Sequence, residues 1–131
     1  MSLNSKELAL EAAYAALEKK AVDPVILDLA GLTVIADYFV ICSGENTPQV
    51  RAITDFIEEA LARKGVKPSR IEGLNHRHWV LIDYGDVIIH IFIQETREYY
   101  SLEKLWMDAA TIEINENKVN MDRKDKGTVH P

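Results

Sequence analysis

Cysteine is almost absent from this sequence, since Cys42 is the only one among 131 residues. A single cysteine excludes an internal disulfide and the paired-cysteine pattern of structural zinc sites, so we expect a reducing compartment. No apolar run approaches the roughly 18 residues that a membrane span needs. Charges such as Glu7, Glu11 and Lys19 interrupt the first twenty residues, which therefore lack a signal-peptide core. These absences predict a soluble, cytoplasmic protein that does not contact membranes.

Basic residues are in the minority. The chain has 15 Lys and Arg against 21 Asp and Glu, which gives a formal net charge of −6 at pH 7. Proteins that bind free nucleic acid favour basic surfaces, because neutralised phosphates supply much of the binding free energy. The acidic balance therefore argues against DNA or RNA binding as the main activity. It is compatible with a basic protein partner, because opposite potentials steer association.

The remaining composition is that of an ordinary globular protein, with 47% hydrophobic and 27% charged residues. The length suits one domain, and a domain of this size buries roughly two thirds of its unfolded surface. Such a core needs no support from metal or disulfide. The chain becomes polar and charged near its end. We therefore expect one domain over residues 1–112 and a disordered tail over residues 113–131.

Local signals predict the order helix, strand, strand, helix, short strand, hairpin, helix. The first helix begins at Asn4, with Glu7 in capping-box position. Thr47 is the expected N-cap of the second helix, and Thr96 that of the last. The expected ranges are helix 5–20, strands 25–29 and 36–43, a helix from 47 to about 64, strand 71–73, hairpin strands 78–84 and 87–93, and a helix from 96 to about 109. Because parallel strands need crossover connections, this order predicts an α/β fold (an α+β mixed sheet covered by helices).

The hairpin around Gly85 and Asp86 is the most informative element. A Gly-X pair suits a two-residue type II′ turn, which fixes the register and places alternate side chains on opposite faces. One face should be nearly all aliphatic and pack against helices: Val80, Ile82, Tyr84, Val87, Ile89 and Ile91. The other face mixes aromatics with an acid and a histidine: Trp79, Leu81, Asp83, Ile88, His90 and Phe92.

The mixed face has two interpretations. It is either the second side of a sandwiched core, or a partly open aromatic patch that anchors a partner. Aromatic side chains with charge at the rim are typical of protein–protein interfaces.

The chain resembles the ribosomal silencing factor, or Iojap-related, family. The resemblance covers roughly residues 5–110 and combines a hairpin core, a turn and a helix motif at fixed spacings. Its main motif is residues 79–92 (WVLIDYGDVIIHIF), then Arg97, Tyr100 and residues 102–106 (LEKLW); further matches are Asp37, Phe39, Cys42-Ser43-Gly44, Gln49-Val50 and Glu72-Gly73. Residues 75–78 (NHRH) are more basic than expected for the family.

The resemblance implies a nucleotidyltransferase-like fold that lacks the catalytic carboxylates. It implies a function as a translation repressor that binds a ribosomal protein on the intersubunit face of the large subunit, number fourteen of the large-subunit series. Such binding blocks joining of the small subunit when nutrients are short. Homodimers are also implied. The implied partner-binding residues are Trp79, Leu81, Asp83, His90, Tyr100 and Lys104, with weaker assignments for Glu95 and Glu103.

An enzyme is the alternative, with a nucleotide bound at the turn of residues 43–47, where Ser43-Gly44 precedes a helix N-terminus. A nucleotidyltransferase also needs two carboxylates one residue apart on a strand to hold metal ions. No such pair follows, because Asp83 and Asp86 are three residues apart and Asp86 lies in the turn. We therefore expect no catalysis and no cofactor. A third possibility is a scaffold that buries the mixed face in its own dimer.

The histidines and the basic cluster give weaker signals. His78 and His90 fall on opposite faces of the predicted hairpin, so they should not share a zinc ion. His90 is then an interface or core histidine. Lys67 and Arg70 could make a secondary contact with ribosomal RNA.

Overall fold

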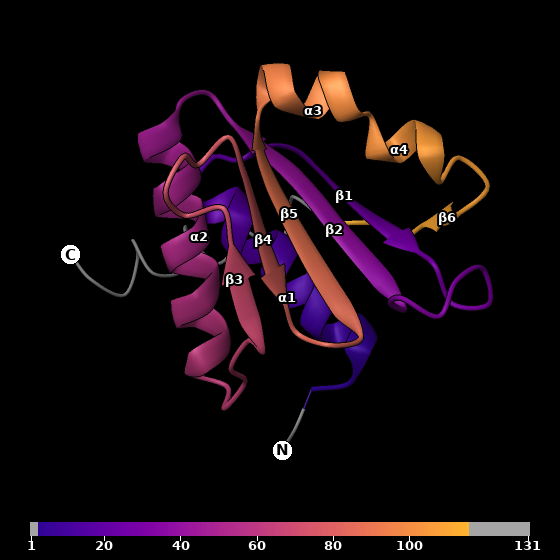
Figure 1. The fold of residues 1–131 in the computed structure, drawn as a ribbon. Coiled ribbons are helices and arrows are strands. Elements are labelled where there is room, and N and C mark those ends of the chain that lie inside the picture. Colours follow the sequence, from indigo (N-terminus) through magenta and orange to yellow (C-terminus); the bar gives the residue numbers. More distant parts are fainter. Residues whose placement is uncertain (1–2, 116–131) are drawn as a thin grey trace.

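A computed structural model of the chain describes residues 3–115, which form a six-stranded sheet with helices on both faces (Figure 1). The strand order is β3-β4-β5-β2-β1-β6. The elements are α1 (Ser5–Glu18), β1 (Val22–Asp28), β2 (Tyr38–Gly44), α2 (Thr47–Ala62), β3 (Arg70–Glu72), β4 (Trp79–Asp83), β5 (Val87–Ile93), α3 (Gln94–Tyr100), α4 (Leu102–Leu105) and β6 (Ala110–Thr111). Among the described strands only β2 and β5 pair in parallel and the other pairs are antiparallel, so the expected mixed sheet is confirmed.

The first two helices begin with side-chain caps. Asn4 and Glu7 form the expected capping box, with Asn4 Oδ1 accepting from the Glu7 amide at 2.8 Å and Glu7 Oε1 accepting from the Asn4 amide at 3.0 Å. The prediction for the second helix was wrong by one residue, because Asn46 is its N-cap and Thr47 is already helical. The side-chain oxygen of Asn46 accepts a hydrogen bond from the Gln49 backbone amide at 2.8 Å. Pro48 lies within the first turn, where a missing amide hydrogen is tolerated.

The predicted hairpin register is confirmed. Trp79 pairs with Phe92, Leu81 with His90 and Asp83 with Ile88. Gly85 has a φ of +87°, a left-handed conformation that glycine adopts without steric cost. The two faces of the hairpin therefore carry the side chains expected from alternation.

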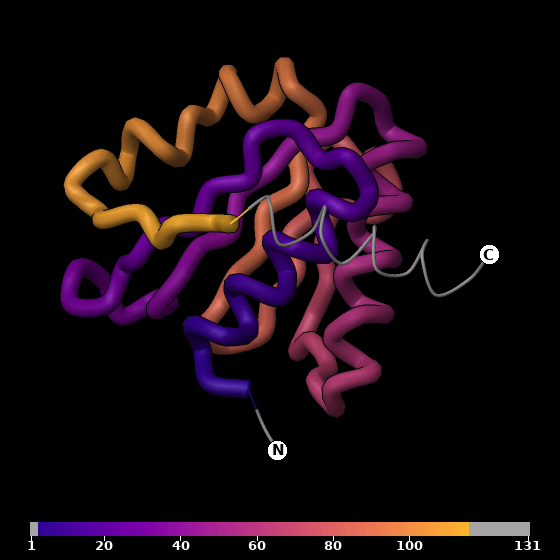
Figure 2. The backbone as a smooth tube through the Cα atoms, turned by 180° about the vertical axis from the view of Figure 1, so that it is seen from behind, coloured from indigo at the N-terminus to yellow at the C-terminus, as the bar shows by residue number. Residues whose placement is uncertain are grey.

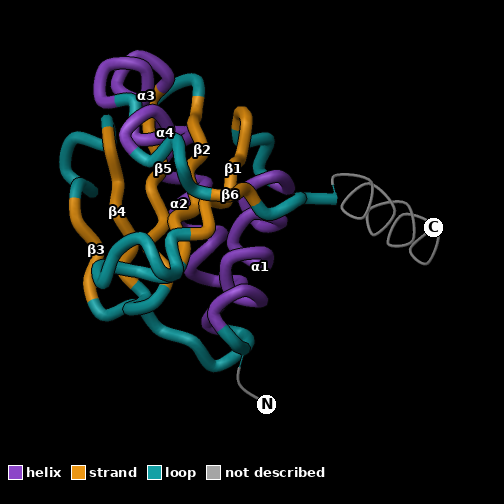
Figure 3. Tube along the Cα trace, turned by 90° about the vertical axis from the view of Figure 1, so that its right-hand side faces the viewer, coloured by secondary structure: helices purple, strands orange, loops and turns teal. Residues whose placement is uncertain are grey.

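The two faces of the sheet are covered differently. Helices α1 and α2 lie side by side over one face and seal the larger core, as the view from behind shows (Figure 2). The aliphatic side chains of β4 and β5 belong to this core, as predicted. On the opposite face the only helices within residues 3–115 are α3 and α4, which pack across one end of the sheet (Figure 3). That face holds a smaller core around Phe39, Ile41 and Phe92, and Trp79 lies at its margin.

The C-terminal third differs most from the prediction. Thr96 does not cap a helix, because the chain passes directly from β5 into α3 and Ile93 is the N-cap, without a side-chain hydrogen bond. The expected single last helix is two short ones, broken at Ser101, which has a φ of +47°. After α4 the chain adds the short edge strand β6 beside β1, which was not predicted. Of the predicted tail (residues 113–131), residues 116–131 lie outside the described part of the chain. Within residues 113–115, Ile114 packs against the larger core.

Strand β1 begins three residues earlier than predicted. The register with β2 shifts between Val22 and Val25, and Asp23 within this bulge has a φ of +45°. A bulge accommodates a proline, which lacks the amide hydrogen of a regular ladder, and Pro24 lies there.

No helix within residues 3–115 is long and apolar enough to cross a membrane.

Candidate partner-binding site

Trp79 is the centre of the mixed sheet face. It is the first residue of β4 and is half-buried. Its ring stacks on Phe92, its partner in the register, with ring centroids 4.9 Å apart. Its indole nitrogen donates a hydrogen bond to His90 Nδ1 at 3.0 Å. The polar end of the indole is therefore used inside the protein, and the remaining surface of Trp79 is aromatic.

His90 lies beneath Trp79 and is only 4% exposed. Its ring also contacts Phe39 edge to face, with centroids 4.5 Å apart. Burial lowers the pKa of His90 to about 4, so the imidazole is neutral at pH 7. Since Nδ1 accepts from Trp79, the proton is on Nε2, which is buried with no hydrogen-bond partner among the described residues. His90 can therefore act on a partner only through Trp79, and its predicted partner contact stays a prediction.

Helix α3 brings two tyrosines to the tryptophan. Tyr100 lies 4.8 Å from Trp79 between ring centroids and is 51% exposed. Tyr99 packs edge to face on Tyr100 at 5.0 Å and is 82% exposed. The family resemblance implied Tyr100 as a binding residue but not Tyr99. The two consecutive tyrosines of a short helix both reach the surface because α3 covers only one end of the sheet.

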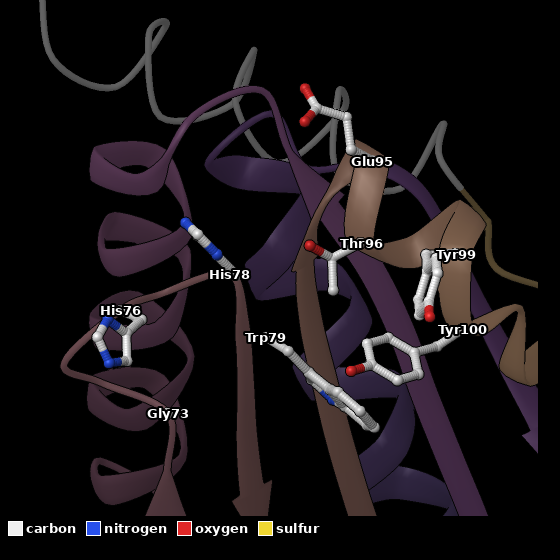
Figure 4. Close-up of a pocket in the computed structure, with 8 residues that line it drawn as sticks. All are labelled: Gly73, His76, His78, Trp79, Glu95, Thr96, Tyr99 and Tyr100. Atoms are coloured by element: carbon white, nitrogen blue, oxygen red, sulfur yellow. The ribbon is translucent and has the colours of Figure 1, made fainter.

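A cavity of about 560 Å³ opens beside these rings, between α3 and the loop that enters β4 (Figure 4). Trp79 and Tyr100 lie next to each other on one side, and His76 and His78 lie on the other. The remaining lining residues are Gly73, Glu95, Thr96 and Tyr99. A smaller hollow of about 260 Å³ continues past Trp79 to Leu81, Glu72 and Gly73.

Asp83 lies at the far end of the same strand, away from the aromatic cluster. Its Oδ2 atom accepts from Arg70 Nε at 3.2 Å, and its Oδ1 atom accepts from the Gly85 amide at 2.8 Å. The carboxylate thus fixes the hairpin turn and pairs with the edge strand β3. A partner would have to compete with Arg70 for it.

Lys104 and Glu103 lie on α4, in a different hollow of about 370 Å³. Lys104 is exposed and available to a partner. Glu103 forms a two-pronged ion pair with Arg97, with both nitrogen–oxygen distances at 3.2 Å. Its weaker assignment as a partner contact therefore competes with an internal role. The predicted residues form two groups, one around Trp79 and one around Lys104.

Arg97 connects α3, which carries Tyr100, to Glu103 of α4, although its only role in the sequence analysis was as part of the family motif. It is 7% exposed, and all five of its donor positions are used. Besides Glu103, it donates to the carbonyl oxygens of Val22 and Asp23 at 3.0 and 2.8 Å and to Ser43 Oγ at 2.8 Å. One guanidinium therefore ties α3 and α4 to the bulge of β1 and the end of β2.

The same contacts bear on the turn of residues 43–47. Ser43 is fully buried, and its hydroxyl accepts from Arg97. It faces the interior of the protein rather than a nucleotide. Asp86, in the hairpin turn, accepts from Ser5 Oγ at 3.4 Å. Within residues 3–115 no three His, Cys, Asp or Glu side chains are grouped so that they could hold a metal ion.

Comparison with known proteins gives consistent matches. A sequence model of the family described as "Ribosomal silencing factor during starvation" matches residues 2–130. The "Ribosomal silencing factor RsfS" of Halalkalibacterium halodurans is 42% identical over 112 residues, which cover 86% of this chain and 96% of that protein. The crystal structure of a Chromobacterium violaceum protein is similar with a TM-score of 0.77 and 31% identity, over 79% of this chain and 87% of that one. The "Mitochondrial assembly of ribosomal large subunit protein 1" of Mus musculus is 37% identical over 73 residues, 53% of this chain and 32% of that protein.

Proposed function

The chain belongs to the family of ribosomal silencing factors, and from this premise we propose that it represses translation by binding the large ribosomal subunit. It works in the cytoplasm as a steric block rather than as an enzyme. The partner is a ribosomal protein of the intersubunit face, number fourteen of the large-subunit series. The bound domain occupies that face and prevents the small subunit from joining under nutrient limitation. The nucleotidyltransferase-like character of the fold stays a prediction.

The observation that supports this proposal is the partly open aromatic cluster around Trp79. A half-buried tryptophan that is stacked on Phe92 and hydrogen-bonded to His90 is held in one orientation before a partner arrives. A rigid aromatic anchor loses little side-chain entropy on binding, and anchors of this kind supply much of the free energy of protein interfaces. The adjacent cavity can accept a side chain of the partner.

The charge of the chain supports the choice of partner. A net charge of −6 steers the domain toward basic ribosomal proteins rather than toward exposed RNA. A secondary contact of Lys67 or Arg70 with ribosomal RNA belongs to the same proposal. Arg70 begins the edge strand β3, and Lys67 lies in the connection between α2 and β3.

The test is cosedimentation of the protein with separated ribosomal subunits. Wild type should sediment with the large subunit and reduce the formation of whole ribosomes when small subunits are added. Trp79→Ala should weaken this binding by about thirtyfold, as expected for loss of an aromatic hot spot worth on the order of 2 kcal/mol. Phe56→Ala, at a half-buried aromatic on the helical face, is the matched control. Unchanged binding of a folded Trp79→Ala variant would refute the assigned face.

The same variants address self-association. If the cluster around Trp79 is instead the interface of a homodimer, Trp79→Ala will lower the molecular mass measured by light scattering. If both events use this face, dimer formation and ribosome binding will compete, and dilution will favour ribosome binding.

A further inference from the structure

We propose that the cavity beside Trp79 binds one cationic side chain of the ribosomal partner, most suitably an arginine guanidinium. This inference rests on the proposed function and assigns a ligand to the cavity between α3 and the loop before β4. It adds Tyr99 to the binding residues and gives Glu95, until now a weaker assignment, a role in determining which partner side chain is accepted.

Three aromatic side chains line the cavity. Trp79 and Tyr100 lie 4.8 Å apart, and Tyr99 stands edge to face on Tyr100 at 5.0 Å. Because the indole N–H is already donated to His90, Trp79 offers its ring and no donor to a ligand. Flat aromatic faces attract cations, and a planar guanidinium also stacks on them more readily than an ammonium does.

Apart from the histidines His76 and His78, the polar side chains that line the cavity are an acid, a threonine hydroxyl and two tyrosine hydroxyls, all of which can accept from a cation. Among the described residues, its lining includes one carboxylate, Glu95, and neither lysine nor arginine. Glu95 stands at the rim on the first turn of α3, and its carboxylate points away from the rings (Figure 4). It meets a ligand held over them only after a rotation of the side chain, which its exposure permits. Arg77, which lies between the two histidines in sequence, does not line the cavity. A phosphate would meet a carboxylate there with no compensating positive charge, so the lining disfavours RNA.

The cavity is formed without a ligand. Trp79 is fixed by its stacking and its hydrogen bond, and the loop opposite is fixed at Gly73. Gly73 has a φ of +89°, and a Cβ atom there would collide with the carbonyl oxygen of Trp79. The loop therefore approaches β4 as closely as a chain can, and the two sides of the cavity hold their separation. Binding needs little rearrangement, which favours affinity for a single inserted side chain.

The test uses the full chain and purified large subunits, with binding measured by cosedimentation. Glu95→Gln should weaken binding by roughly threefold, and Glu95→Arg by roughly tenfold or more, because a positive charge then faces a positive ligand. Glu59→Gln and Glu59→Arg are the controls, since Glu59 is an exposed carboxylate of α2 on the helical face and lines neither this cavity nor the hollow of Lys104. They remove or reverse the same charge and should leave binding within about twofold of wild type.

The aromatic part is tested at Tyr99. Tyr99→Leu should weaken binding by roughly threefold or more, whereas Tyr99→Phe keeps the ring and should restore it. Because Tyr99 is 82% exposed, neither change should alter the unfolding transition. A loss in both variants, or in neither, would contradict a role for the aromatic face.

The outcomes separate this inference from the proposed function. If wild type fails to sediment with large subunits, the proposed function itself is wrong. If Trp79→Ala loses binding while all Glu95 and Tyr99 variants bind normally, the function stands and the assigned ligand is wrong. If Glu95→Gln strengthens binding, and protein-free ribosomal RNA binds the chain and protects Tyr99 from modification, then the cavity binds RNA and the inference is overturned.

Discussion

The indole nitrogen of Trp79 donates a hydrogen bond to Nδ1 of His90 across the β4–β5 pair, at 3.0 Å. The bond requires a neutral imidazole, because Nδ1 must be free of a proton to accept. A residue that is only 4% exposed thus helps to set the orientation of the half-buried Trp79, together with the stacking on Phe92. The same relationship makes the face sensitive to pH.

The first prediction is that stability falls with acid because of His90. Its pKa is about 4 in the folded protein and 6.5 ordinarily, so the unfolded chain takes up the proton first as pH falls. Stability is then complete above about pH 6.5 and is lost between about 6.5 and about 4. The free energy of unfolding should drop by about 2 kcal/mol between pH 7 and pH 5 from this group. Urea unfolding at both values measures it.

His90→Asn supplies the comparison for this prediction, because an amide can accept from the indole but does not titrate. The variant should lose about 2 kcal/mol less than wild type over the same pH interval. His76→Asn changes an exposed histidine of the loop before β4 and should follow the wild-type curve. If wild type and His90→Asn have parallel pH profiles, His90 is not the titrating group.

The second prediction concerns Arg97. Arg97→Met removes all five donors and leaves Ser43, Glu103 and the bulge of β1 without them. Removal of one partner of a buried ion pair costs about 3–5 kcal/mol, and we expect a loss in that range by urea unfolding. The exposed pair of Arg51 and Asp55 is the control, since Arg51→Met should cost less than about 1 kcal/mol. Equal costs at the two arginines would contradict the anchoring role.

The third prediction concerns Gly73. Gly73→Ala should destabilise the protein by about 2 kcal/mol or more, because the new methyl group meets the carbonyl oxygen of Trp79 in addition to the strain of a positive φ. Gly65 has a similar φ of +81° and open space around it, so Gly65→Ala should cost only about 1 kcal/mol. The melting temperatures of the two variants distinguish the effects, because Gly65→Ala introduces backbone strain alone and Gly73→Ala introduces strain and a collision. A collision at Gly73 should also displace Trp79 and change its fluorescence, which Gly65→Ala should leave unchanged.

The fourth prediction concerns Cys42. Burial raises the pKa of its thiol to about 12, against a smaller lowering by Arg97, and the side chain is fully buried. A chromogenic disulfide reagent should therefore react with the folded protein far more slowly than with the protein in urea. The absorbance of the released thiolate measures both rates. A fast reaction in the folded state would mean that the centre of the sheet opens readily.

The sequence predicted those parts of the fold that local chemistry determines. The Gly85-Asp86 turn and strict alternation fixed the register of β4 and β5, and with it the two faces. The capping box at Asn4 likewise needs only neighbouring residues. These elements could be predicted because each signal lies within a few residues of what it determines.

Features that depend on distant contacts were missed. Strand β6 has two exposed residues and no alternation, and it exists because the chain passes beside β1. The break at Ser101 has no glycine or proline to mark it, and Ile93 caps α3 without a polar side chain. In the sequence, Arg97 cannot be distinguished from a surface arginine of a helix. Its burial depends on contacts with the β1 bulge, which lies over seventy residues earlier in the chain.

The candidate site was predicted only in part. Alternation on the hairpin identified Trp79, the family resemblance implied Tyr100, and the structure brings the two rings together. The burial of His90 depends on tertiary packing, which the sequence alone does not specify. The hydrogen bond between Asp83 and Arg70 depends on the pairing of the edge strand β3 with β4, which the sequence does not specify either. Glu95 and Tyr99 gain their interest from a cavity that only the folded chain has.

The position of β5 has a consequence for how the chain is made. This strand is the fifth in sequence but lies between β4 and β2, and it is the only one that joins the two halves of the sheet. Until residues 87–93 are in place, both halves expose unpaired strand edges, which are prone to aggregate. A nascent chain therefore passes through a vulnerable interval that ends only once its fifth strand has emerged, and chaperones should be most useful to it during that interval.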